Sequence, residues 1–84
     1  MTYRLLIDYE AFKVLSGLKK SAQQLIHQML RRIQELPSEW VDYEEKDSTG
    51  RPLHVSIVGE YAVTYWEDAV DRQVKVLEIT RADS

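Results

Sequence analysis

The second half of the chain alternates apolar and polar residues with a period of two, and this pattern constrains the fold more than any other feature. Residues 53–58 (LHVSIV) and 61–66 (YAVTYW) alternate in this way, and only Gly59 and Glu60 separate them. Residues 74–80 (VKVLEIT) form a third run after a turn. Alternation places every second side chain on one face of a strand. Because strands joined by such short turns pair with each other, we expect an antiparallel meander.

The stretch before the meander has the longer period of helices. Residues 9–18 predict a short first helix. Ser21 begins a second helix, whose apolar residues recur every three or four positions until Pro37 ends it. Ser21 and Gln24 have the spacing of a capping box, which predicts that Ser21 caps this helix. The two segments therefore predict a helical hairpin that packs on the sheet.

Two further segments complete the expected order of elements. Residues 3–8 (YRLLID) predict an N-terminal strand. Residues 38–50 (SEWVDYEEKDSTG) are polar and acidic, and they predict a loop with a short extended piece at residues 40–44. We thus expect an α+β domain of order β-α-α-β-β-β, in which two N-terminal helices pack on an antiparallel sheet of three to four strands. The 84 residues suffice for one domain, residues 1–84.

Charge and composition narrow the classes of function. The first 40 residues carry six Lys/Arg and four Asp/Glu, whereas the rest carry five and ten, and the net charge is −3. Nucleic-acid binders usually have a basic surface, so the acidic sheet half argues against a large nucleic-acid face. The absence of cysteine excludes a disulfide framework and a thiolate zinc site, and we expect neither a metal nor a cofactor. No apolar run is long enough for a membrane span, and the sequence predicts a cytoplasmic protein.

Four stretches resemble the RelE/ParE superfamily, the small toxins of bacterial toxin–antitoxin pairs. They are YRLLIDYEAFKVLSGL, the helix end IQELP, the hairpin IVGEYAVTYWED and the final strand VKVLEITR. The run from Gly59 to Tyr65 is the most specific, because in the family it often reads Gly-Asp-Tyr-Arg-Val-x-Tyr. The resemblance covers nearly the whole chain. It implies a RelE/ParE-like fold and a cognate antitoxin as partner, with the ribosome and its mRNA or DNA gyrase as the target.

The sequence departs from the family at the residues that would cleave RNA. Cleavage by the 2′-hydroxyl needs groups that accept and donate a proton, and cations that stabilise the phosphorane. The family's hairpin arginine is replaced by Ala62, and Arg81 alone remains of a C-terminal basic cluster. These departures weaken the nuclease interpretation.

Few residues remain as candidates for a polar site. Arg51, His54 and Arg81 flank or lie on the expected meander and are weak candidates for one polar cleft, because ordinary surface positions explain them better. Trp40 and Trp66 are candidates for either interaction anchors or core residues.

The sequence therefore leaves several functions open. The leading hypothesis is a toxin-like component that inhibits translation in the RelE manner, with degraded or absent endonuclease residues. One alternative is a ParE-like gyrase inhibitor that acts by binding. Another is an inactive RelE-fold module with a binding or regulatory role, for example as a homodimer. The last alternative is a different protein that merely shares this order of elements.

Overall fold

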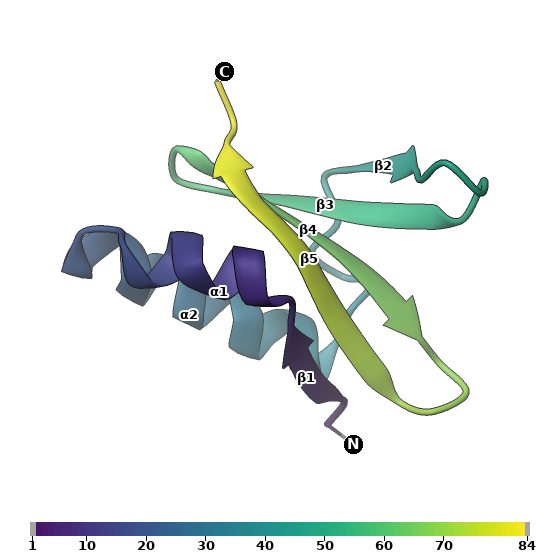
Figure 1. Cartoon of the computed structure of the whole chain (residues 1–84). Coiled ribbons are helices and arrows are strands. Elements are labelled where there is room, and N and C mark those ends of the chain that lie inside the picture. Colours follow the sequence, from purple (N-terminus) through teal and green to yellow (C-terminus); the bar gives the residue numbers. More distant parts are fainter. Residues whose placement is uncertain (1, 84) are drawn as a thin grey trace.

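The structure, a computed structural model, describes residues 2–83 and contains two helices and five strands within that range (Figure 1). The order is β1 (Arg4–Ile7), α1 (Tyr9–Ser16), α2 (Lys20–Glu35), β2 (Tyr43–Lys46), β3 (Pro52–Val58), β4 (Tyr61–Asp68) and β5 (Gln73–Arg81). The α+β class, the two helices and the meander are confirmed. No helix among the described residues is long and apolar enough to cross a membrane.

The sheet has one strand more than the expected maximum. Its order is β1-β5-β4-β3-β2, in which β1 pairs parallel with β5 and all other pairs are antiparallel. The additional strand is β2, which lies inside the segment expected to be a loop. Asp42 begins this pairing, because its N–H donates to Val55 O over 2.8 Å and its carboxylate accepts from Ile57 N over 2.6 Å.

The capping box predicted at Ser21 is wrong. Helix α2 begins at Lys20 with Lys19 as its N-cap, and no side chain caps it. The connection from α1 is short, so Ser21 already lies inside the first turn of α2. Gln23 stabilises the corner instead, because its amide donates to Ser16 O and Leu18 O, each over 3.1 Å. Helix α1, in contrast, is capped by Asp8, whose carboxylate accepts from Glu10 N over 3.0 Å.

The turn between β3 and β4 follows the expected chemistry. Gly59 has φ +60°, and only the first of the two turn residues is left-handed, as a type II′ hairpin requires. Glycine adopts this conformation without strain. A tight turn fixes the register of β3 against β4, so that His54 lies opposite Tyr65 and Ile57 lies opposite Ala62.

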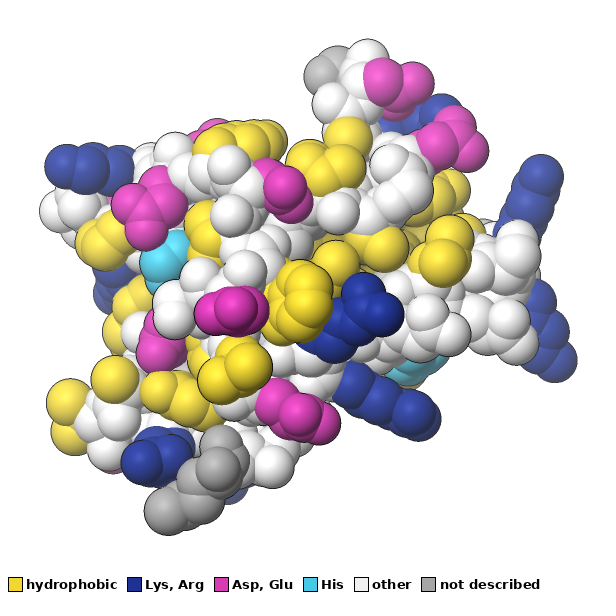
Figure 2. Space-filling view, turned by 180° about the vertical axis from the view of Figure 1, so that it is seen from behind, with side chains coloured by type: hydrophobic (Ala, Val, Ile, Leu, Met, Phe, Trp, Pro, Cys, Tyr) yellow, Lys and Arg dark blue, Asp and Glu magenta, His cyan; other side chains and the backbone are white. Residues whose placement is uncertain are grey.

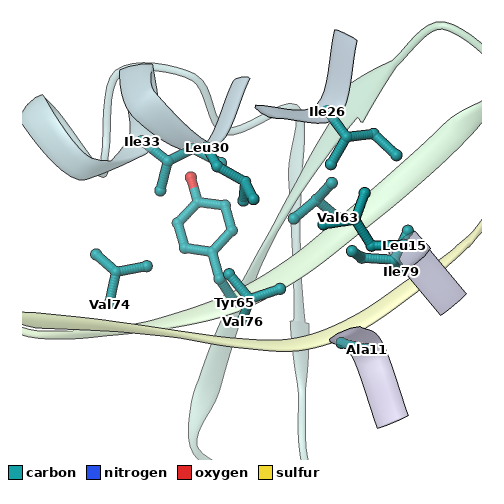
Figure 3. Close-up of a cluster of buried hydrophobic side chains, with 10 residues drawn as sticks. All are labelled: Ala11, Leu15, Ile26, Leu30, Ile33, Val63, Tyr65, Val74, Val76 and Ile79. Atoms are coloured by element: carbon teal, nitrogen blue, oxygen red, sulfur yellow. The ribbon is translucent and has the colours of Figure 1, made fainter. Parts of the chain in front are cut away.

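The core lies between the helices and one face of the sheet (Figure 3). Tyr65 is fully buried and projects from β4 toward Leu30 and Ile33 of α2. The other members of this cluster are Ala11, Leu15, Ile26, Val63, Val74, Val76 and Ile79. Burial of these apolar side chains is the main stabilising contribution to a domain of this size.

The hydroxyl group of Tyr65 connects the core to the linker that follows α2. It donates to Pro37 O over 2.6 Å, while the neighbouring Ser56 Oγ donates to Trp40 O over 2.6 Å. Ser56 Oγ also lies 3.3 Å from Tyr65 Oη. Because a serine hydroxyl has one proton, the shorter bond to Trp40 is the one it makes. Both buried hydroxyls thus donate hydrogen bonds to carbonyl groups of the linker.

Removal of one of these hydroxyls should measure the strength of the connection. Tyr65→Phe leaves Pro37 O without its donor and should lower the free energy of unfolding by about 1–2 kcal/mol. Urea denaturation would measure the change, with Tyr43→Phe as the control because Tyr43 is half-exposed. Equal stability of both variants and the parent would show that the buried bond contributes nothing net.

The same residue predicts a dependence on alkaline pH. Burial raises the pKa of Tyr65 above its ordinary value, and the nearby hydroxyl of Ser56 only partly opposes this. The folded state therefore favours the neutral phenol. Its contribution to stability is complete below the pKa of the unfolded chain and is lost as pH rises through the higher folded pKa. In a tyrosinate absorbance titration, Tyr65→Phe should remove a late-titrating step.

Candidate functional site

The helices cover one face of the sheet and leave the opposite face, here called the open face, without a helix. Register assigns residues to it, because Ala62, Thr64 and Trp66 alternate on β4 with the core residues Val63 and Tyr65. Residues of the neighbouring strands that lie opposite them complete the open face: Val55 and Ile57 on β3, and Lys75, Glu78 and Thr80 on β5. It is therefore mostly apolar and uncharged at its centre.

Ala62 lies at this centre, opposite Ile57 on one side and Thr80 on the other. It is only 5% exposed, and Thr64 next to it on the same face is 6% exposed. Both side chains are closely surrounded by their larger neighbours. An arginine at position 62 would have to extend past those neighbours to reach solvent. The position expected to carry a phosphate-binding cation is thus a small, covered apolar one.

Trp66 is the most distinctive residue of the open face, and it contacts two cations. The guanidinium carbon of Arg51 lies 4.3 Å from its ring centroid, and Lys75 Nζ lies 5.5 Å from it. Lys75 is directly opposite Trp66 on β5. Arg51 also forms an ion pair of 3.8 Å with Asp47. Of the two interpretations left open for Trp66, the core is excluded, because this side chain faces away from the helices.

His54 lies on the opposite, helix-covered face, next to Tyr65, with a ring-to-ring distance of 5.5 Å. Its side chain is 16% exposed and lies between two carboxylates. Nδ1 is 3.2 Å from Glu44 Oε2 but is not aligned for a hydrogen bond, and Nε2 is 3.9 Å from Glu67 Oε1. The other oxygen of Glu67 accepts from the hydroxyl of Tyr3 over 3.0 Å, and this bond raises the pKa of Tyr3.

Arg81 lies at the other end of the sheet, opposite Tyr61. Its guanidinium pairs with Glu60 over 2.7 Å and with Asp83 over 3.4 Å. These hydrogen bonds raise the pKa of Arg81 and lower that of Asp83. The groove beside it, of about 280 Å³, is formed with Lys19 and the hairpin turn.

The structure does not bring the three candidate residues into one cleft. Arg51 stacks on Trp66 at the open face, His54 lies beside Tyr65 on the other face, and Arg81 lies opposite Tyr61 at the start of β4. Any role of these residues in catalysis stays a prediction. Sequence reasoning missed Lys75, whose only signal was its place in an alternating strand. It also missed Glu44 and Glu67, the neighbours of His54.

On the side of the molecule shown in Figure 2, the surface charges are mixed in sign. Figure 2 shows the side of the molecule seen from behind Figure 1, where basic and acidic side chains are interspersed. A shallow groove of about 330 Å³ on the outer side of α2 is lined by Gln24, His27, Gln28 and Arg31. Among residues 2–83, no group of three His, Asp or Glu side chains is placed to bind a metal ion.

The stacking of Arg51 on Trp66 can be tested directly. Arg51→Gln should lower stability by about 0.5–1 kcal/mol, the usual contribution of an exposed cation–π contact. In a Trp40→Phe background, Arg51→Gln should also change the fluorescence of Trp66. Lys46→Gln removes a cation from the neighbouring β2 as a control. Unchanged fluorescence in Arg51→Gln would show that the two side chains do not stack in solution.

Comparison with known proteins gives a likeness of structure over nearly the whole chain. No protein-family model matches the sequence, and no curated protein matches it. The RelE–RelB complex from the archaeon Pyrococcus horikoshii OT3 contains a chain that is 25% identical, with a TM-score of 0.80 and 96% of both chains covered. The chain has the fold of a RelE toxin.

Other RelE structures agree with this fold at lower sequence identity. The RelBE2 complex from Mycobacterium tuberculosis matches with a TM-score of 0.83 at 13% identity, over 96% of this chain and 99% of the other. Isolated RelE from E. coli matches with a TM-score of 0.71 at 19% identity, over 98% of this chain and 86% of that toxin. The resemblance inferred from the four sequence stretches is thus confirmed for the RelE fold.

Proposed function

We propose that this chain is the toxin-like component of a toxin–antitoxin pair and that a cognate antitoxin protein binds it. The observation that carries the proposal is the RelE fold over nearly the full length of the chain. The similar structures from P. horikoshii and M. tuberculosis are toxin–antitoxin complexes, and the toxin of E. coli has been solved with its antitoxin as well.

We further propose that the chain inhibits translation in the RelE manner with little or no cleavage of mRNA. Cleavage would need a proton acceptor, a proton donor and free cations on one surface. The open face offers Arg51 and Lys75, but both contact the ring of Trp66. His54, the imidazole of the meander, faces the helices. This distribution supports binding to a target more than acid–base chemistry upon it.

The second candidate is an inhibitor that acts by binding alone, as the gyrase-directed members of the RelE/ParE superfamily do. The apolar centre of the open face, with Trp66 and its two cations at one side, favours this candidate. Such a surface resembles the anchors of protein interfaces, in which tryptophan and arginine are enriched. An inactive binding or regulatory module would use the same surface without a toxic effect.

A reconstituted translation reaction separates these functions. Purified ribosomes and factors would translate a reporter mRNA with and without the chain, and the mRNA would then be analysed on a gel. The proposal expects reduced protein synthesis with intact mRNA. Reduced synthesis with cleaved mRNA would identify a nuclease that uses other residues. Full synthesis would overturn the ribosomal proposal, and a supercoiling assay with gyrase would then test the second candidate.

Ala62→Arg tests whether the missing arginine limits cleavage. The variant should raise ribosome-dependent cleavage above that of the parent, because it restores a cation at the centre of the open face. Val70→Arg is the matched control, since Val70 lies in the β4–β5 turn and is 92% exposed. Circular dichroism would verify that both variants fold. Normal ribosome binding by Ala62→Arg without any cleavage would show that Ala62 is not the limiting residue.

A test of the partner does not depend on the target. The chain would be co-expressed with each reading frame adjacent to its own in the genome. We expect one of these products to co-purify in a fixed ratio and to relieve any inhibition of translation. If no adjacent product binds, the proposal of a cognate antitoxin encoded beside the chain fails.

A further inference from the structure

Helix α2 has a second apolar stripe beside the one that it buries. Ile26, Leu30 and Ile33 face the core and are at most 2% exposed. The second stripe, here called the α2 seam, lies along one flank of the helix and consists of Ala22, Leu25, Met29, Arg32 and Leu36. Its spacing of alternately three and four residues is the heptad pattern by which one helix packs along another. The core leaves much of the α2 seam uncovered, because Leu25 is 48% and Leu36 57% exposed.

Arg32 is the one charged residue of the α2 seam, and its charge is drawn toward the C-terminal end. Its guanidinium carbon lies 5.3 Å from the ring centroid of Trp40, an exposed residue of the linker after α2. A long side chain that turns its charge aside can still contribute its aliphatic stem to an apolar contact. The ring of Trp40 thus extends the α2 seam beyond Leu36.

A groove continues the α2 seam at its N-terminal end. It has a volume of about 280 Å³, and Ala22 and Leu25 line it on the side of α2. Gly59 and Tyr61 line it on the side of the β3–β4 hairpin. A Cβ placed on Gly59 would lie 3.6 Å from Leu25 Cδ1, so the hairpin turn and the helix lie next to each other there. Figure 2 shows apolar side chains gathered across the middle of the side on which α2 lies.

The two ends of the α2 seam carry opposite charges. Lys19 lies at the N-terminal end and lines the groove. Glu35 is the last residue of α2, and Glu39 follows one turn later, where its N–H donates to Leu36 O over 3.1 Å. These three charged residues are exposed. A helix of the same sequence that runs in the opposite direction would therefore match the charges of the seam at both ends.

We propose that the α2 seam is a two-fold interface, in which α2 of a second copy of the chain packs antiparallel against it. The axis would pass near Met29, at the middle of the seam. Ala22 of each copy would then face Leu36 of the other copy, and Leu25 would face the stem of Arg32. Each contact occurs twice, as in other two-fold symmetric dimers.

Charge selects the antiparallel direction. A parallel pair would place Lys19 beside Lys19 and Glu35 beside Glu35, and like charges at an interface repel each other. The antiparallel pair brings Lys19 of each copy toward Glu35 and Glu39 of the other. The second copy is thus an occupant whose apolar stripe and charges both fit the seam.

This pairing goes beyond the proposed inhibition of translation, and it does not depend on the target. The α2 seam lies on the side of the sheet that the helices cover. Both open faces therefore stay exposed when two copies pair. The dimer would present two copies of the surface around Trp66, so that it could bind two sites at once.

Sedimentation equilibrium of the full chain tests the pairing. We expect an equilibrium between monomer and dimer that shifts toward the dimer as the protein concentration rises. Leu25→Glu should weaken the dimer at least about tenfold, because each interface would bury two unpaired carboxylates. Phe12→Glu is the matched control, since it adds the same charge at an exposed apolar position of α1 and should leave the dimer unchanged. Urea denaturation would verify that both variants fold. A chain that is monomeric at every concentration, or an equal loss in both variants, would overturn the proposal.

Ser21 and Glu35 test the direction of the pair. They lie on the same side of α2, fourteen positions apart, and this separation of about 21 Å excludes contact within one chain. Antiparallel pairing brings Ser21 of each copy toward Glu35 of the other. Ser21→Glu should therefore weaken the dimer about fivefold, and the added change Glu35→Lys should restore it.

The monomer itself predicts the opposite effect of Ser21→Glu. Glutamate in the first turn stabilises a helix, so a weaker dimer would not come from a less stable α2. An unchanged dimer in Ser21→Glu, or a weaker dimer that Glu35→Lys does not restore, would overturn the antiparallel interface.

Discussion

The hydrogen bond from the Tyr65 hydroxyl to Pro37 O is the interaction on which the arrangement of this small domain depends. A buried hydroxyl must find a partner, and here the partner is the first carbonyl after the C-terminal cap of α2. Together with the bond from Ser56 to Trp40 O, it holds the linker of α2 against the sheet. The linker in turn leads β2 to the outer side of β3. One tyrosine on the central strand thus relates the helix, the linker and the sheet edge.

The parts of the fold that depend on periodic burial could be predicted from the sequence. Ile26, Leu30 and Ile33 recur at helical spacing and are all buried, and the meander alternates as expected. Strand β2 could not be found in this way, because its residues YEEK are all exposed and carry no apolar alternation. Its formation depends on hydrogen bonds of Asp42 to β3, which are contacts distant in the sequence. The capping box failed because the connection between the helices is too short to leave Ser21 outside α2.

The candidate site was harder to predict. Which residues lie together there depends on the face of the strand that each one occupies and on the end of the strand at which it lies. Alternation indicated that His54 and Trp66 point to particular faces, but only the position of the helices shows which face is covered. Strand β5 adds a second difficulty. Val76 and Ile79 are both in the core although they are three residues apart, because the register between β4 and β5 shifts at Thr64 and Tyr65. Such a bulge re-aims side chains and gives no signal in a pattern of period two.

Strand β2 has a consequence for how the protein can vary. Its four residues are exposed, and the turn that follows is closed by local bonds, in which Asp47 Oδ1 accepts from Thr49 N over 2.9 Å and from Arg51 N over 2.9 Å. None of its residues belongs to the core. Opening of β2 and this turn therefore exposes little of the apolar surface whose burial stabilises the domain. Changes of length or sequence in β2 and its turn should therefore leave the core intact, so this segment can accept new sequence at little cost in stability.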